Sequence, residues 1–436
     1  MRGGGSTKAT ISLLCSLGSL VACAPDSSDF GISEGPATST APIQIATTTT
    51  PVQEPDSETT VDASTDEPTS TTTTLPSGLL PVPNDDPLPP VASLQNIPLK
   101  LTPVAHIVLT LGMAWNQIEG YFYIITQEGE IYRAPRDFST TELVLDMKSE
   151  VSPFIYGSER GMLGVAVNPI DGRLFVYFTD LDYNSHVVSF GFTDGKPDPF
   201  KRHEVLFVQQ PGISHKAGNL AFDDDGNLYI SFGDGGGNKG RTSQDYLSLL
   251  GSIVRITPNG DSDGYTVPDD NPFVGDPTKA PELYVKGLRQ PHRFTYNRAN
   301  GDIYIGDVGE NKAEELNYLP AGTKGVNFGW YFVEGFTQRV PGGEGIEFTP
   351  PIYQFEHPSW VAIITGFVYH GNAIPALKGS LIFGDMTGKV SALGADGIAP
   401  LGISEQGNVI TSFAEGPDGE LYTLTLDKGV QRIDPA

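Results

Sequence analysis

One short phrase recurs six times between Glu119 and Tyr422, and it restricts the fold more than any other feature of the chain. Each copy joins a glycine-containing turn to alternating apolar residues, usually with Tyr or Phe among them. The copies are Glu119-Gly-Tyr-Phe-Tyr, Asp171-Gly-Arg-Leu-Phe, Asp225-Gly-Asn-Leu-Tyr, Asn300-Gly-Asp-Ile-Tyr, Lys378-Gly-Ser-Leu-Ile and Asp418-Gly-Glu-Leu-Tyr. Asp-Gly or Asn-Gly before such an alternation is a strong hairpin signal. The phrase therefore predicts six similar β-units.

The spacing of these copies averages about 60 residues, which suits the blades of a propeller once loops are allowed. We therefore predict an all-β fold, a six-bladed β-propeller over residues 100–436. A pair of β-sandwiches is the alternative, but it does not explain the repeated phrase. In a propeller, ligands bind where the inner strands and their loops meet at the central channel, so polar residues next to the strand phrases are the candidate site.

The first residues have the pattern of an export signal. Arg2 and Lys8 precede an apolar run, residues 9–22, that is too short to span a membrane. The run ends in Leu20-Val-Ala-Cys23, which resembles the lipobox of bacterial lipoproteins. We predict a lipoprotein-type signal peptide over residues 1–23 with a lipid on Cys23, and an ordinary cleaved signal is the alternative. The protein is then anchored at the extracytoplasmic face of the cell membrane, or secreted.

Residues 24–99 are rich in Thr, Ser and Pro and contain eleven acidic residues but no Lys or Arg. Such a segment has too little apolar surface to offset the entropy lost on ordering, so we predict a disordered tether. The formal net charge of the chain is -26, which argues against a nucleic-acid partner because nucleic acids demand basic patches.

A loop between Gly309 and Glu315 has the composition of a calcium site. Calcium takes oxygen ligands from carboxylates and backbone carbonyls, and Gly309 next to Glu310, with Glu314 and Glu315 nearby, could supply both. His215 and Arg289 lie next to strand phrases and are candidates for chemistry. Each has a structural alternative: a lone histidine before a strand is more often structural than catalytic, and Arg289 could brace the acidic loop.

Two further motifs are interpreted as turns. The Asp223-Asp-Asp-Gly226 run lacks the spacing of an EF-hand loop and predicts a solvated hairpin turn. The run Asp234-Gly-Gly-Gly has the composition of a turn, because glycine permits positive φ. His292, His357 and His370 show no metal-ligand spacing among themselves and are expected to be ordinary polar residues.

With these motifs the chain resembles the soluble glucose/sorbosone dehydrogenase family, which includes pyrroloquinoline quinone (PQQ)-dependent aldose dehydrogenases and hedgehog-interacting-protein-like proteins. The resemblance covers essentially the whole of residues 100–436. The matching motifs include Glu159-Arg-Gly-Met-Leu-Gly, His215-Lys-Ala-Gly-Asn-Leu, Tyr229-Ile-Ser-Phe-Gly-Asp-Gly-Gly, Gly287-Leu-Arg-Gln-Pro-His-Arg-Phe, Gly306-Asp-Val-Gly-Glu-Asn and Asn327-Phe-Gly-Trp.

The resemblance implies PQQ and calcium as cofactors and a sugar as substrate. It implies that His215 accepts the proton of the anomeric hydroxyl while hydride passes to the quinone, and that Arg289 binds the cofactor and stabilises negative charge on it. An external electron acceptor would then reoxidise the cofactor. By the same resemblance, Gly309 and Glu310 are the carbonyl donors to calcium and Glu314 is the nearby acid.

The chain departs from the enzymes of this family at several cofactor-binding positions. The altered positions are Glu159 (glutamine in the family), Ser214 (acidic), Gln290 (asparagine), Thr387 (lysine) and Val409 and Thr411 (arginines). Lys389 lies close to the lost lysine. PQQ carries three carboxylates, and the loss of three cations weakens its binding. Lys216, Arg241, Arg293 and Lys312 are the candidate replacements.

Three functions are therefore consistent with the sequence. The first is an exported aldose dehydrogenase that uses PQQ and calcium, with Glu159, Arg289, Gln290, Thr387 and Lys389 at the cofactor. The second is a calcium-stabilised propeller without catalysis that binds a carbohydrate or a protein at the cell surface. The third is a calcium-dependent lactonase, since six-bladed propellers host that chemistry too. The retained His215 and Arg289 favour the first.

Overall fold

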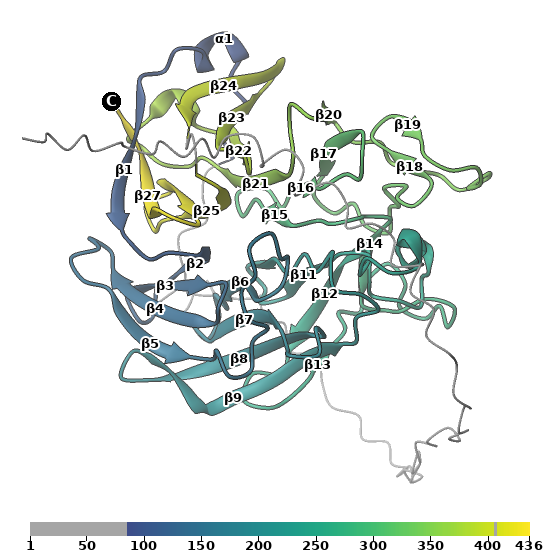
Figure 1. Cartoon of the computed structure of the whole chain (residues 1–436), viewed down its shortest axis with the longest axis horizontal. Coiled ribbons are helices and arrows are strands. Elements are labelled where there is room, and N and C mark those ends of the chain that lie inside the picture. Colours follow the sequence, from purple (N-terminus) through teal and green to yellow (C-terminus); the bar gives the residue numbers. More distant parts are fainter. Residues whose placement is uncertain (1–84, 405–407) are drawn as a thin grey trace, which may run out of the picture. The chain divides into compact units, whose positions relative to one another are not determined.

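The computed structural model describes residues 85–404 and 408–436. The predicted signal peptide, Cys23 and most of the predicted tether lie outside these residues. The described part of the chain forms six antiparallel sheets of four or five strands and one two-stranded sheet (Figure 1). Neighbouring innermost strands contact one another around a closed ring, so the predicted six-bladed β-propeller is confirmed.

The blades follow one another along the chain, and each runs from its innermost strand outward. Blade 1 contains β2 (Thr110–Asn116), β3 (Tyr121–Thr126), β4 (Glu130–Pro135) and β5 (Glu142–Asp146). Blade 2 contains β6 (Met162–Val167), β7 (Leu174–Thr179), β8 (Ser185–Thr193) and β9 (Lys196–Val208). Blade 3 contains β10 (Leu220–Phe222), β11 (Leu228–Phe232) and β12 (Ser252–Pro258), with β13 (Tyr265–Thr266) and β14 (Leu283–Lys286) both paired to β12.

Blade 4 contains β15 (Arg293–Tyr296), β16 (Ile303–Asp307), β17 (Ala313–Leu319) and β20 (Tyr353–Glu356). A small hairpin of β18 (Val333–Glu334) and β19 (Thr337–Gln338) lies in the long β17–β20 connection. Blade 5 contains β21 (Ile363–Val368), β22 (Leu381–Asp385), β23 (Lys389–Gly394) and β24 (Gly397–Ser404). Blade 6 contains β25 (Ile410–Glu415), β26 (Leu421–Thr425) and β27 (Gly429–Pro435), and β1 (Leu99–Ala105) is its outermost strand.

The repeated phrase marks the same place in every blade. Its six glycines all have a φ between 74° and 85°, and each lies one or two residues before the second strand of a blade. Residues with a Cβ rarely adopt this φ, which explains why each turn carries glycine. The strand that follows is buried on both faces between neighbouring blades, and this explains its apolar and aromatic character.

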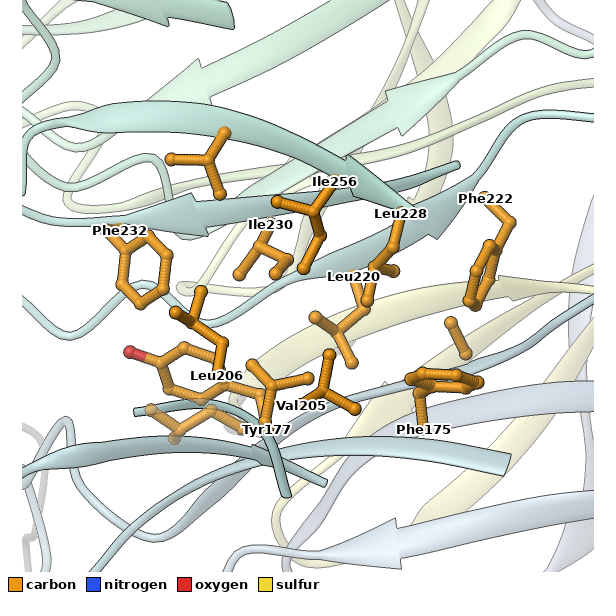
Figure 2. Close-up of a cluster of buried hydrophobic side chains, with 14 of the residues drawn as sticks. Phe175, Tyr177, Val205, Leu206, Leu220, Phe222, Leu228, Ile230, Phe232 and Ile256 are labelled. Carbon is orange, nitrogen blue, oxygen red and sulfur yellow. The ribbon is translucent and has the colours of Figure 1, made fainter. Parts of the chain in front are cut away.

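Apolar side chains fill the space between adjacent blades. Between blades 2 and 3, Phe175 and Tyr177 on β7 pack towards Phe222, Ile230 and Phe232 on β10 and β11 (Figure 2). The rings of Phe175 and Phe222 meet edge to face with centroids 5.0 Å apart. Such contacts join neighbouring blades, so the loops above them have a rigid support.

The folded part begins before β1. Residues 85–98, which the sequence interpretation assigned to the tether, pack on blade 5, and Leu94 of α1 (Val91–Leu94) is completely buried. The carbonyl of Pro89 accepts a hydrogen bond from Ala395 N at 2.8 Å. The helices of the described residues are too short to cross a membrane.

Candidate functional site

The loops that lead into the inner strands and the loops between second and third strands lie on one face of the propeller. His215 lies on the loop before β10, and Asp234 follows β11. His215 Nδ1 lies 2.6 Å from Asp234 Oδ1, and Asp234 Oδ2 accepts a hydrogen bond from Trp330 Nε1 at 2.8 Å. Asp234 and Trp330 are 1% and 5% exposed, so the acid is almost fully removed from water. The arrangement orients the imidazole and assigns Nδ1 to the carboxylate, which leaves Nε2 for a ligand.

Close approaches at two glycines make this geometry possible. His215 has a φ of 54°, in the left-handed region, and its carbonyl lies against Gly233. A Cβ at Gly233 would overlap that carbonyl oxygen, so no larger residue fits without displacing His215. A Cβ at Gly240 would lie 2.7 Å from both Asp234 Oδ2 and Trp330 Nε1. Glycine at both positions lets backbone pack directly on the buried hydrogen bonds.

Asp234 is held in its charged form. Burial by itself would raise the pKa of Asp234, but the hydrogen bond and charge of His215, the charge of Arg289 and the Gly236 amide together hold it below its ordinary value. The sequence predicts that Asp234 is part of a turn. The structure shows that its side chain is the partner of His215.

Glu159 and Gln290 brace the backbone around His215. Glu159 Oε2 accepts hydrogen bonds from His215 N and, at 3.1 Å, from Gln290 Nε2. Gln290 Oε1 accepts a bond from Ala217 N at 3.0 Å. The two predicted cofactor residues therefore lie together beside the histidine, and their polar atoms are occupied by each other and by this loop.

Arg289 completes the cluster. Its guanidinium carbon lies 5.5 Å from the centre of the Trp330 ring, and its carbonyl accepts a hydrogen bond from Asp234 N at 2.8 Å. One terminal nitrogen donates to the carbonyl of Val308 at 2.9 Å, so Arg289 does brace the acidic loop, although through a carbonyl and not a salt bridge. Arg289 is 7% exposed and its buried Nε has no hydrogen-bond partner in the described structure. A buried donor left unpaired is costly, which makes this nitrogen a natural contact for a ligand oxygen.

The side chains of the predicted calcium loop have protein partners. The carboxylate of Glu310 is paired with Arg339, at 2.6 and 2.8 Å. Glu314 is completely buried and binds His357 Nε2 at 2.7 Å and Ile363 N at 2.9 Å. A Cβ at Gly309 would overlap the Ala313 carbonyl. The amides of Glu310, Asn311 and Lys312 instead converge on one oxygen of Glu334, at 2.8–2.9 Å.

A different pair of acids lies just below this loop. Asp307 and Glu315 are directly opposite each other on β16 and β17, and both are buried. Burial is the main cause that raises the pKa of Asp307 well above its ordinary value, and repulsion by Glu315 adds to it. Burial also raises the pKa of Glu315 to about 7. Asn317, two residues further on β17, has a buried Oδ1 without a partner. Within residues 85–404 and 408–436 no group of three or more His, Cys, Asp or Glu side chains has a metal-binding arrangement.

Thr387 and Lys389 are engaged within blade 5. Thr387 Oγ1 donates to Asp385, and Lys389 Nζ donates to the carbonyl of Ser359 and lies 5.5 Å from the centre of the Trp360 ring. Neither makes a contact with the His215 cluster among the bonds of the described residues. Their assignment to a cofactor stays a prediction.

The other basic residues differ in their surroundings. Lys216 is completely buried, donates to the carbonyl of Gly212, and has its pKa lowered by burial to about 8. Arg293 is buried at the start of β15, where its pKa is lowered by burial to about 9. It donates to the Leu111 carbonyl at 2.6 Å and to Ser412 Oγ at 3.0 Å, and so links three inner strands. Arg241 is exposed and faces Tyr331.

The central channel contains a cavity of about 200 Å³ between the inner strands. Glu415, at the end of β25, lines it together with Leu111 and Ser412. Burial raises the pKa of Glu415 to about 7, although Arg298 partly offsets the effect. The carboxyl is therefore poorly solvated in its charged form.

The fold and this cluster define a class: a six-bladed propeller with a histidine–aspartate pair and a buried arginine on its loop face. A family model described as glucose/sorbosone dehydrogenase matches residues 113–432. The chain therefore belongs to the glucose/sorbosone dehydrogenase family.

The chain is similar in sequence both to an aldose sugar dehydrogenase and to Hedgehog-interacting protein. It is 30% identical over 238 residues to aldose sugar dehydrogenase of Escherichia coli K12, which is 51% of this chain and 60% of that protein. It is 28% identical over 345 residues to human Hedgehog-interacting protein, which is 72% of this chain and 46% of that protein. The chain thus covers only part of these relatives' lengths.

Solved structures agree with the fold. Apo aldose sugar dehydrogenase of Escherichia coli has a TM-score of 0.63 at 20% identity, covering 78% of this chain and 100% of that chain. The PQQ-bound aldose sugar dehydrogenase of Streptomyces coelicolor has a TM-score of 0.61 at 22% identity, covering 77% and 97%.

Proposed function

We propose that this protein is a PQQ-dependent dehydrogenase that oxidises a sugar at its anomeric carbon. The observation that carries the proposal is the His215–Asp234 hydrogen bond of 2.6 Å, held in place by Trp330. A base that is oriented by a buried carboxylate is the recurring arrangement for abstracting a proton from a hydroxyl group. A purely structural histidine does not need a charged acid that is 1% exposed behind it.

The chemistry assigned to this chain's residues is limited to proton transfer and charge stabilisation. His215 Nδ1–H donates to Asp234, and Nε2 accepts the proton of the anomeric hydroxyl as that oxygen becomes a carbonyl. Asp234 stabilises the resulting imidazolium without being protonated. PQQ, when bound, supplies the acceptor for the hydride that leaves the anomeric carbon. The sugar thereby loses two electrons and becomes a lactone.

Arg289 fits a quinone oxygen or carboxylate. Its guanidinium is buried beside Trp330 and its Nε–H is without a partner among the described residues, so an anionic oxygen would satisfy it. Gln290 and Glu159 would border the same ligand. Glu159 carries a carboxylate where the sequence resemblance places glutamine, and this charge opposes binding of an anionic cofactor.

For calcium, we propose Asp307 and Glu315 together with the Asn317 oxygen as a second possibility beside the predicted set of Gly309, Glu310 and Glu314. Two buried acids facing each other repel when both are charged, and a divalent cation relieves that repulsion. In the predicted set, the Glu314 carboxylate would first have to give up His357.

We also propose that the protein is exported and held at the membrane through a lipid on Cys23. The test is the mass of the mature N-terminus and the membrane fraction of wild type beside Cys23→Ser. A soluble variant and a membrane-bound wild type support the anchor, and equal distribution of the two refutes it.

The dehydrogenase proposal is tested by calorimetric titration of the full chain with PQQ in saturating calcium, with dye reduction on a panel of aldoses. We expect Arg289→Ala to weaken binding by about 10- to 100-fold, the worth of one charge-assisted contact. His215→Ala should bind PQQ and lose dye reduction. If a folded, calcium-saturated wild type binds no PQQ, the proposal fails.

A non-catalytic binding protein is the second candidate, favoured by the loss of cations near the channel. Thr411, at a position where the resemblance implies arginine, donates its hydroxyl to the carbonyls of Thr110 and Leu424. This function predicts that sugar or protein ligands bind without any PQQ binding in the same titration.

A further inference from the structure

The cavity in the central channel reaches the face of the propeller opposite His215. His215 lies before β10, on the side where the inner strands begin. The cavity of about 200 Å³ lies between these strands and continues to the turns that follow them, where Gln117, Ile118 and Gly416 line it. Gln117 and Ile118 are exposed, so the cavity is open to water at this end.

Arg293 separates the cavity from the His215 face. It is the first residue of β15 in blade 4, which stands opposite blade 1 in a ring of six. Its guanidinium donates to the carbonyl of Leu111 in blade 1 at 2.6 Å and to Ser412 Oγ in blade 6 at 3.0 Å, so it crosses the channel. Both acceptors lie near the starts of their strands and line the cavity. The cavity therefore ends at a buried cation and is distinct from the His215 cluster.

Glu415 is a lining side chain that is left for a ligand. It lies at the end of β25, is partly exposed, and its carboxylate makes no hydrogen bond or ion pair with any residue that the structure describes. The other polar groups nearby are engaged. The Arg298 guanidinium contacts Asp224 Oδ1 at 2.7 and 2.8 Å, and the amides of Asn116 and Asn219 each donate to a backbone carbonyl at 2.7 Å.

Much of the remaining lining is apolar and aromatic, and it includes the half-buried Trp115, Tyr296 and Phe367. A carboxylate next to aromatic surface is the combination that recognises an organic ammonium ion, through its charge and through cation–π contacts. Calcium needs about six to eight oxygen ligands, whereas Glu415 is the one carboxylate among the described residues of the lining. Since a cavity of about 150 Å³ holds benzene, an ion of about that size fits.

The turns around the open end add negative charge. Four of the six repeated turns carry an acid directly before the glycine: Glu119, Asp171, Asp225 and Asp418. Lys378 takes this place in the fifth turn, and Arg136 pairs with Asp418 at 3.0 Å. These two cations offset only part of the charge, so the field at the mouth attracts cations.

We infer that this cavity binds a small organic ammonium ion, with Glu415 as its counter-ion and Arg293 as the closed end. The inference does not depend on the proposed dehydrogenase function, because the two sites lie on opposite sides of Arg293. It also gives a role to a carboxyl that is unfavourable by itself. Burial raises the pKa of Glu415 to about 7, so its charged form costs stability unless a cation lies beside it.

Saturation-transfer NMR at pH 8, where the Glu415 carboxyl is ionised, measures the binding of choline and of ethanolamine to the full chain. Their neutral isosteres, in which carbon replaces the nitrogen, are dimethylbutanol and propanol. We expect at least one of the two ions to bind, and its isostere to bind at least about tenfold more weakly. Glu415→Gln should weaken binding of the ion about 10- to 100-fold, whereas Glu415→Asp keeps the charge and should retain most of it.

The exposed Glu347→Gln, on the β17–β20 connection, is the control and should bind as wild type. Glu415→Gln is expected to be more stable than wild type at this pH, so its loss of binding would not come from unfolding. The inference is overturned if neither ion binds, if the isosteres bind as tightly as the ions, or if Glu415→Gln binds like wild type. Glycerophosphocholine carries the choline cation on a larger anionic group and should bind more weakly than choline. Tighter binding would assign the cavity to a lipid head group and refute a free ion.

Discussion

Replacement of Asp234 by Asn should destabilise the protein by about 3 kcal/mol at pH 7. The carboxylate accepts three hydrogen bonds, from His215 Nδ1, Gly236 N and Trp330 Nε1. An amide keeps one acceptor oxygen and turns its NH₂ group towards a donor, so one buried donor is left unpaired at about 1–3 kcal/mol. The remaining bonds lose their charge-assisted part, about 1 kcal/mol more.

The pH dependence gives this prediction its sign. The pKa of Asp234 is lowered in the folded protein, so its ionised form contributes stability above the ordinary value of 3.8. That contribution is lost from wild type, and not from the variant, as pH falls through and below 3.8. The difference in free energy of unfolding should therefore narrow in acid. Asp223→Asn is the matched control, because burial raises the pKa of Asp223. The difference in free energy of unfolding between wild type and this variant should therefore widen in acid.

Urea unfolding at pH 7, 5 and 3.5 measures both variants, and dye reduction at pH 7 measures turnover. The loss of an oriented base should lower kcat by at least about 100-fold. Equal unfolding midpoints at pH 7 for wild type and Asp234→Asn would refute the reasoning about the buried carboxylate. A difference that widens in acid would show that Asp234 is not held in its charged form.

Three other changes test separate parts of the structure. Glu415→Gln should stabilise the protein by about 2 kcal/mol at pH 8, because the charged form of a carboxyl whose pKa is near 7 is disfavoured in the folded protein. In thermal unfolding, this gain in stability should vanish near pH 4.5. An equal gain from the exposed Glu347→Gln would contradict the reasoning. Calcium at 100 times its Kd should stabilise wild type by about 2.7 kcal/mol. Loss of this effect in Glu315→Gln but not in Glu314→Gln would favour the Asp307–Glu315 site, and the opposite pattern would favour the predicted loop. Gly233→Ala should unfold at lower urea and lose dye reduction, because its Cβ overlaps the His215 carbonyl; a variant with wild-type turnover would show that this loop yields easily.

Much of the architecture could be predicted because it follows from local chemistry. A glycine turn before an apolar strand is written in consecutive residues, and six copies specify six blades. The partners of His215 could not be predicted in this way, because they are not close to it in the sequence. Asp234 is 19 residues from His215 and Trp330 is 96 residues from Asp234, so the pairing of β10 with β11 and the loops of two successive blades bring them together. Their spacing alone carries no signal, and the glycines after Asp234 favoured a turn.

The acidic loop shows a second limit of sequence reasoning. Its composition suited calcium, but composition does not say where a carboxylate points. Glu310 turns to Arg339, and Glu314 turns inward to His357 because it occupies a buried position on β17. Lys389 likewise is near the expected position in sequence but donates to Ser359. Side-chain partners of this type depend on distant loops and need the tertiary structure.

The pairing of β1 with β27 has a consequence for the order in which the propeller forms. The two strands are registered from Leu99 opposite Pro435 to Ala105 opposite Val430, so blade 6 joins segments more than 300 residues apart. Contacts of such separation form late, because a long loop must close before they form. During synthesis the ring cannot close until the last strand has emerged. Blade 6 is therefore completed by β27, whose pairing with β1 joins the two ends of the propeller.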